Sequence, residues 1–162
     1  MKTDVHLICG PIGAGTTTFA NALAEETSAM LFSIDQWMIQ LYGPDAPKNL
    51  TPDWYEPRVA RCERQIWTLV EQASGKRVAS VLDLGFQQKR HREKIIDWSI
   101  GSGLTPVLHV MDAPREERWT RVERRNDLGD AESHLRITRP MFDFIESRWA
   151  PPTGAELQWV KD

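Results

Sequence analysis

A glycine-rich turn near the start of the chain constrains the fold most. Residues 5–9 form a short, mostly apolar and β-branched run, which predicts a buried strand. Residues 10–17 follow at once and hold three glycines, and apolar residues then recur at helical spacing over residues 19–24. A strand, a tight glycine-rich turn and a helix in this order are typical of an α/β fold.

The rest of the chain continues this alternation of strand and helix. Further apolar runs that predict strands lie at residues 30–34, 78–82, 106–111 and 157–160, with helical periodicity between them. Residues 78–82 are small and apolar throughout, as in a central strand covered on both faces. We therefore predict a three-layer α/β sandwich with a five-stranded parallel sheet and right-handed crossovers. No repeat or linker interrupts it, so we expect one domain over residues 1–162.

Charge and hydropathy exclude several classes of protein. Charged residues are interleaved throughout, and no stretch approaches the roughly 18 apolar residues of a membrane span. The first residues lack the pattern of a signal peptide, so we expect a cytoplasmic chain with reduced Cys9 and Cys62. Lys and Arg number 20 against 23 Asp and Glu, a net charge of -3, which gives no general attraction to nucleic acid or membrane. The oligomeric state stays open.

The glycine-rich turn fits the spacing of a phosphate-binding loop, G-x-x-x-x-G-K-[ST], except that Thr16 stands where lysine is expected. Glycines let the N–H groups of such a loop point inward, and the following helix N-terminus adds positive potential. Thr17 keeps the hydroxyl that would bind Mg²⁺. The dinucleotide fingerprint fails because Thr18 replaces its third glycine. The alternative is a plain connecting turn. The predicted phosphate-binding residues are Gly10, Pro11, Ile12, Gly13, Ala14, Gly15, Thr16, Thr17 and Thr18.

Two acids follow predicted strands. Asp35 comes after residues 30–34, and Asp83 comes after residues 78–82. Both would lie at the carboxyl edge of the sheet, where open parallel sheets bind ligands. An acid at the position of Asp83 can hold the Mg²⁺ shell. The alternative for each is a helix cap or a turn residue.

Four segments together resemble one family: residues 10–17, 32–38 and 81–86, and Asp112-Ala113-Pro114 leading into three arginines and Asn126. The chain resembles the small P-loop kinase-like proteins, a group that includes bacterial AAA-domain ATP-binding proteins, chloramphenicol phosphotransferase and zeta toxins. The resemblance covers residues 4–160. It implies a nucleoside-monophosphate-kinase-like fold with sheet order 2-3-1-4-5, and ATP- and Mg²⁺-dependent phosphorylation of a hydroxyl on a small molecule. It also implies that Asp35 accepts the proton of that hydroxyl.

An arginine stripe follows the fourth predicted strand. Its members, spaced by three, three and four residues, share one helix face and are Arg115, Arg118, Arg121 and Arg125. The resemblance implies a lid over roughly residues 114–138, with Arg118 and Arg121 catalytic and Arg125 binding the nucleotide. The alternative is a solvated face, because Glu117 can pair with Arg121.

Aromatic residues flank the loop after Asp35, namely Trp37, Tyr42, Trp54 and Tyr55. They are either packing residues or part of an acceptor pocket, in which Asp45, Asp53 and Glu56 would suit a cationic acceptor. A basic run at residues 89–94 is either a solvated face or an anion site.

Thr16 decides how far this function can be carried. Removing one preorganised charged donor of this kind costs a factor of about 10²–10³ in rate. Three explanations stay open: poor phosphate transfer, a substitute cation such as Lys89 or a lid arginine, or deliberate replacement that traps a ground state. The sequence therefore predicts an ATP-binding phosphotransferase, and the alternative is a non-catalytic nucleotide-binding or partner-binding module.

Overall fold

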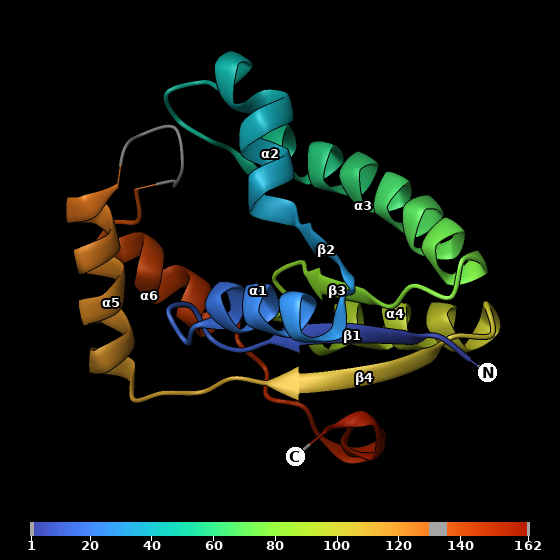
Figure 1. The fold of residues 1–162 in the computed structure, drawn as a ribbon. Helices are drawn as coiled ribbons and strands as arrows, with labels where there is room; N and C mark the ends of the chain where they lie inside the picture. Colours follow the sequence, from blue (N-terminus) through green and yellow to red (C-terminus); the bar gives the residue numbers. More distant parts are fainter. Residues whose placement is uncertain (1, 130–135, 162) are drawn as a thin grey trace.

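The computed structural model describes residues 2–129 and 136–161. Its centre is a four-stranded parallel sheet in the order β2-β3-β1-β4 (Figure 1). The strands are β1 (Asp4–Cys9), β2 (Met30–Ser33), β3 (Ser80–Asp83) and β4 (Thr105–Val110). The α-helices are α1 (Thr16–Thr27), α2 (Ile34–Tyr42), α3 (Pro52–Gly75), α4 (Lys89–Gly101), α5 (Arg115–Leu128) and α6 (Arg139–Ser147).

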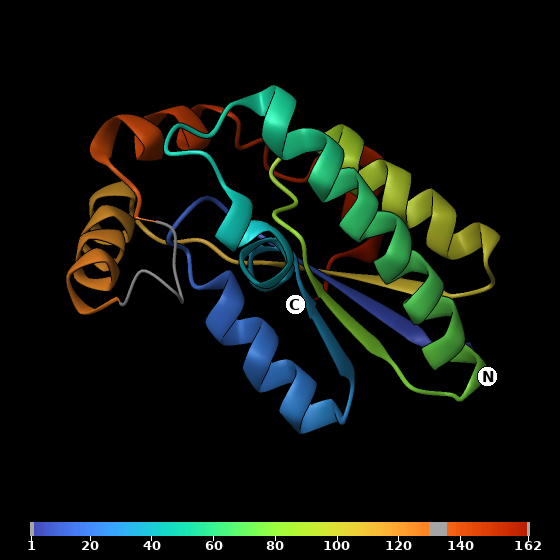
Figure 2. The same cartoon turned by 90° about the horizontal axis from the view of Figure 1, so that it is seen from above.

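Helices cover both faces of the sheet, as the alternation predicts. Figure 2 shows α1 on one side and α3 with α4 on the other. Neighbouring residues of one strand face opposite cores. Leu7 and Leu82 belong to the larger core with α3 and α4, whereas Ile8 and Val81 pack against α1. The α/β sandwich with a parallel sheet is therefore confirmed.

The fifth strand is not formed, so the predicted order 2-3-1-4-5 is wrong in its last position. Residues Gly154–Trp159 instead form a short 3-10 helix. Thr153 and Glu156 close this helix with a capping box, and Glu156 is fixed by a buried ion pair with Arg92. Val160 meets the sheet only as an isolated bridge to Leu108, whose carbonyl accepts a hydrogen bond from the Lys161 amide at 2.9 Å.

The second strand ends one residue earlier than predicted. Ile34 already belongs to α2, because the Ser33 hydroxyl accepts a hydrogen bond from the Gln36 amide at 3.5 Å and caps the helix. Asp35 therefore lies in the first turn of α2 rather than at the end of the strand, and Ser33, not Asp35, is the N-cap.

Helices α5 and α6 lie beyond the carboxyl ends of the strands (Figure 1). Helix α5 occupies more than half of the predicted lid over residues 114–138, residues 130–135 of that lid lie outside the described residues, and α6 begins just after it. The Asn126 side chain holds the segment that leads into α6: its amide donates to the Ile137 carbonyl at 2.7 Å, and its oxygen accepts from the Ile137 amide at 3.0 Å. No helix within residues 2–129 or 136–161 is long and apolar enough to cross a membrane.

Candidate functional site

The glycine-rich loop joins β1 to α1 at the carboxyl edge of the sheet. Gly13 and Gly15 have φ angles of 77° and 92°, in the left-handed region that favours glycine. A Cβ atom on Gly13 would lie 2.6 Å from the Arg118 carbonyl oxygen, and one on Gly10 would lie 2.6 Å from the Met111 carbonyl oxygen. The loop therefore needs glycine both for its path and for close contact with the chain after β4.

The remaining loop residues complete a tight turn. The Ala14 amide donates to the Pro11 carbonyl at 3.1 Å, and Gly15 directly precedes the first turn of α1. Thr17 and Thr18 are exposed in that turn, and Thr16 is half-buried. The first amides of a helix have no partner within the helix, so this turn can bind an anion.

Thr17 and Asp83 meet below the loop. The Thr17 hydroxyl donates to the Asp83 carboxylate at 2.8 Å. Burial raises the pKa of Asp83 to about 6, while the hydrogen bonds from Thr17 and Thr16 oppose that shift and the charge of Asp35 adds to it. Thr16, which stands in the lysine position, therefore also helps to hold down the pKa of this acid.

Asp35 belongs to this group of acids. Its charge raises the pKa of Asp83, and it also adds to the rise in the pKa of Tyr55 to about 12, of which burial is the larger cause. Asp35 thus lies near Asp83, which the Thr17 hydroxyl joins to the start of α1, as the carboxyl ends of β2 and β3 predict.

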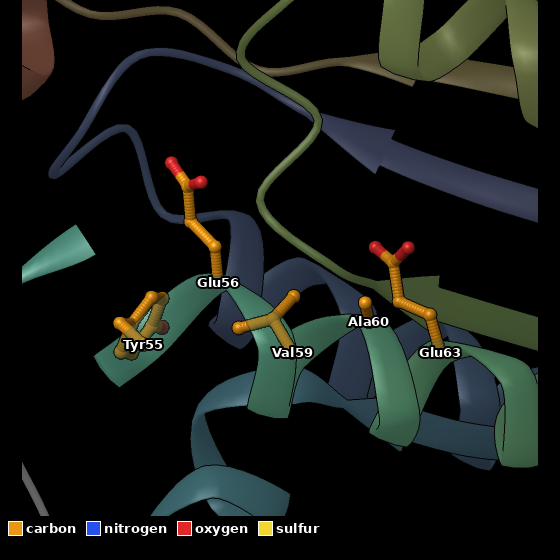
Figure 3. A pocket seen from close by; sticks show the side chains of 5 residues that line it. All are labelled: Tyr55, Glu56, Val59, Ala60 and Glu63. Carbon is orange, nitrogen blue, oxygen red and sulfur yellow. The ribbon is translucent and has the colours of Figure 1, made fainter. Parts of the chain in front are cut away.

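A shallow pocket lies along α3, beside this edge of the sheet. Tyr55, Glu56, Val59, Ala60 and Glu63 line it, and Figure 3 shows Glu56 and Glu63 pointing to the same side of the helix. Glu63 is held by the His91 ring of α4, with 2.7 Å between Oε1 and Nε2.

The predicted acceptor residues divide in the structure. Tyr55 and Glu56 line the pocket, but Asp45 and Asp53 do not. Trp54 and Tyr42 instead stack on the Arg58 guanidinium, at 4.2 and 5.6 Å from the ring centroids. Glu63 was missed from the sequence, although its one-turn spacing from Val59 on α3 was a signal for it.

The buried side chain of Arg118 connects three segments through hydrogen bonds. Its guanidinium donates to both carboxylate oxygens of Glu146 at 2.5 and 2.6 Å, to the Ala113 carbonyl at 2.8 Å and to the Ile12 carbonyl at 3.0 Å. The hydrogen bonds with Glu146 raise the pKa of Arg118 and lower that of Glu146. Arg118 therefore links α5 to α6 and to the glycine-rich loop.

The other predicted arginines are exposed. Arg121 pairs with Glu117 at 2.5 Å and donates to the Gly13 carbonyl at 3.4 Å. Arg125 follows one turn later on α5. Arg115 pairs with Asp143 of α6 at 2.5 Å.

The basic run at the start of α4 contains a structural residue. Arg92 is fully buried and donates to Glu156 at 2.7 and 3.2 Å and to the Phe86 carbonyl at 3.0 Å. Gln87, which follows Phe86 in the chain, donates from its side chain to the Gly10 carbonyl at 2.9 Å. Arg92 thus fixes the segment that supports the glycine-rich loop. Its spacing of three and four residues from Ile95 and Ile96 was the signal for burial.

The donor set fits magnesium bound together with phosphate. A hydroxyl and a carboxylate oxygen are hard ligands of the kind that Mg²⁺ prefers, with phosphates and water completing its shell. Within the described part of the chain, no group of three or more His, Cys, Asp or Glu side chains could hold a metal ion on its own. The loop fits phosphate through its glycines and amides, but Thr16 offers it no charge.

A parallel sheet of order 2-3-1-4, with a glycine-rich loop after β1 and an acid as the last residue of β3, defines a P-loop protein of the kinase-like class. The family model described as "AAA domain" matches residues 5–140, and the chain belongs to this family. The resemblance seen in the sequence is thereby confirmed. A search of curated proteins found no match.

Solved structures share the fold at low identity. A protein assigned as a kinase from Chloroflexus aurantiacus is 16% identical with a TM-score of 0.72, and the match covers 96% of this chain and 84% of that one. Kti12 from Chaetomium thermophilum, in complex with ADP-AlF3, is 16% identical with a TM-score of 0.65, and the match covers 92% and 81%. In the Pnkp1/Rnl/Hen1 RNA repair complex, one chain is 16% identical with a TM-score of 0.70 over 91% of this chain. This chain spans only 44% of that protein's length.

Proposed function

We propose that the protein binds ATP with Mg²⁺ and transfers the γ-phosphate to a hydroxyl of a small molecule. The hydrogen bond from Thr17 to Asp83 carries this proposal, because it places a hydroxyl and a carboxylate together at the start of α1, below the glycine-rich loop. Support comes from the family, from a similar fold in a protein assigned as a kinase, and from the ADP-AlF3 bound by Kti12.

Each residue of the loop edge has a proposed task. The loop amides and the first turn of α1 bind the phosphates. Thr17 and Asp83 hold the magnesium ion, which neutralises charge on the phosphates when bound. Asp35 orients the acceptor hydroxyl and accepts its proton.

The arginines of α5 take different tasks in this proposal. Arg118 uses its donors on Glu146, Ala113 and Ile12, so it acts by holding the loop in shape. Arg121 and Arg125 are exposed and are available to phosphate oxygens. The pocket along α3 receives the acceptor. Tyr55 lines this pocket, and the charge of Asp35 contributes to the raised pKa of Tyr55.

Thr16 supports a second candidate. A loop that lacks its lysine can retain binding and lose turnover, because its amides remain while a charged donor is gone. The second candidate is therefore a non-catalytic nucleotide-binding or partner-binding module of the same fold.

Phosphate transfer to a panel of acceptors separates the two. The panel contains polyols, sugars, amino sugars, nucleosides, hydroxylated antibiotics and a short RNA with a 5′-hydroxyl, each incubated with labelled ATP and Mg²⁺. We expect at least one labelled product, and a loss of about 10²-fold or more in Asp35→Asn. Asp97→Asn on the exposed side of α4 is the matched control. ATP binding without transfer to any acceptor would favour the binding module instead.

A further inference from the structure

The glycine-rich loop lacks its lysine, so the cations around it decide whether another residue takes that role. Arg118 and Arg92 are 4% and 0% exposed and are bound to Glu146 and Glu156. Freeing Arg92 would leave the buried carboxylate of Glu156 without its partner, which is strongly unfavourable. Freeing Arg118 would break its two hydrogen bonds with the partly buried Glu146 and its bonds to the Ala113 and Ile12 carbonyls. Both are therefore structural.

Lys89 is a weaker candidate than its position suggests. It lies at the start of α4 and its ammonium is 3.6 Å from Glu93, on the same helix. The segment between β3 and α4 reaches the loop through Gln87, which binds Gly10, and not through Lys89.

Arg121 differs from these residues. One of its terminal nitrogens donates to the Gly13 carbonyl at 3.4 Å, and its side chain remains 47% exposed. The backbone beneath it is fixed at the loop, since the Arg118 carbonyl leaves no space for a Cβ on Gly13. The backbone of Arg121 thus lies one helical turn beyond the point where α5 contacts the loop, and its guanidinium reaches back to the loop at Gly13.

The second partner of Arg121 does not prevent this role. Its pair with Glu117 is an exposed i,i+4 pair with both side chains about half exposed, and such pairs contribute little to stability. A phosphate can therefore compete for the guanidinium. Arginine stays charged at all relevant pH values and binds phosphate oxygens in a bidentate manner.

The neighbourhood of Thr16 also calls for a cation from elsewhere. Thr17 donates to Asp83 and Thr16 supplies no charge, while the further charge acting on Asp83 is that of another acid, Asp35. A polyphosphate would add more negative charge at the same place.

We propose that Arg121 replaces the missing loop lysine, so that the charge on the terminal phosphates of the nucleotide is neutralised from α5 rather than from position 16. This assignment rests on the proposed nucleotide binding. It makes α5 part of the phosphate site.

A double-mutant cycle tests this directly. Dissociation constants for ATP, ADP and AMP with Mg²⁺ are measured by calorimetry for the wild type, Arg121→Ala, Thr16→Lys and the double variant. Arg124→Ala, an exposed arginine on the same helix, is the matched control. Thermal unfolding of each variant checks that it folds.

We expect Arg121→Ala to weaken ATP binding by about 10-fold or more and AMP binding by less than about 2-fold, because the cation acts on the terminal phosphates. In the Thr16→Lys background, the same change should cost less than about 3-fold. Arg124→Ala should bind like the wild type.

Two results overturn the assignment. The first is that the wild type binds ATP and Arg121→Ala either binds it equally or loses affinity for ATP and AMP by the same factor. Arg121 is then not the substitute cation, although the proposed nucleotide binding is retained. If neither the wild type nor Thr16→Lys binds ATP at millimolar concentration, the proposed function fails and this assignment falls with it.

Discussion

Thr17 of α1 donates its hydroxyl hydrogen to Asp83 at the end of β3 across 2.8 Å, although 66 residues separate them in the chain. The parallel pairing of β1 with β3 brings them together, because it puts the carboxyl ends of both strands at one edge. An exposed hydroxyl beside a buried carboxylate, under a glycine-rich loop, is the feature on which the nucleotide site depends.

Asp83→Asn should stabilise the chain without nucleotide at neutral pH. Burial raises the pKa of Asp83 from 3.8 to about 6 in the folded chain. Between about pH 4 and pH 6 the folded state retains a proton that the unfolded state has lost, so this group lowers the free energy of unfolding as the pH rises. Above about pH 6 the full cost, at most about 3 kcal/mol, is present.

Chemical denaturation of both chains at pH 5 and pH 8 checks this. The difference in unfolding free energy between Asp83→Asn and wild type should grow with pH, while Mg²⁺-dependent ATP binding is lost. A difference that is the same at both pH values would contradict a raised pKa.

Gly13→Ala should damage both the fold and the site. The new Cβ would lie 2.6 Å from the Arg118 carbonyl oxygen, and the residue would keep a φ of 77°. We expect the free energy of unfolding to fall by about 2 kcal/mol or more, and ATP binding to be lost. Gly75→Ala is the matched control, because it ends α3 with nothing within 4 Å of the added atom. Equal melting temperatures for the two variants would argue against the close contact.

Glu156→Gln should be far more destabilising than Glu93→Gln, although both break an ion pair with a residue of α4. Arg92 and Glu156 have side chains 0% and 2% exposed, so the change leaves a buried guanidinium without its counter-charge and costs about 3–5 kcal/mol. Lys89 and Glu93 are about half exposed, and their loss should change stability by less than about 0.5 kcal/mol. Urea denaturation at pH 7 measures both, and similar midpoints would contradict the burial of Arg92.

The histidine pair inside the sheet should make the fold sensitive to acid. His6 Nδ1 and His109 Nε2 lie 3.0 Å apart between β1 and β4. Burial is the main reason that the pKa of His109 falls to about 4 and that of His6 is lowered. As the pH falls, the unfolded chain takes up these protons at a higher pH than the folded chain does. The free energy of unfolding is therefore highest above about pH 6.5 and decreases as the pH falls toward 4.

His109→Gln removes one of these groups. The slope of unfolding free energy between pH 6.5 and pH 4.5 should therefore be shallower in this variant than in wild type. An unchanged slope would show that His109 is not buried in its neutral form.

Much of this architecture follows from the sequence. The apolar runs before Gly10, Asp83 and Asp112 predict three strands, and the glycine spacing at residues 10–15 predicts the loop, because each depends on local chain geometry and burial. The acids meet because parallel strands end at one edge, which needs only the strand pattern.

Long-range pairing explains what the sequence did not predict. The apolar pattern of residues 157–160 predicts a strand. In the structure, Glu156 pairs with the buried Arg92, and residues Gly154–Trp159 form a 3-10 helix. Arg118 shares its spacing with the exposed arginines, and only the distant Glu146 and Ile12 distinguish it as a buried residue. Neither partner can be read from local periodicity.

Calorimetric titration of ATP with Mg²⁺ into the wild type and Thr17→Val tests the central claim most directly. This change removes the hydroxyl that binds Asp83 and keeps the shape of the side chain. We expect one nucleotide per wild-type chain, and binding weakened by about 10-fold or more in Thr17→Val, with a smaller loss when Mg²⁺ is omitted. No binding by the wild type at millimolar ATP, or equal binding by both chains, would contradict a nucleotide site built on Thr17 and Asp83.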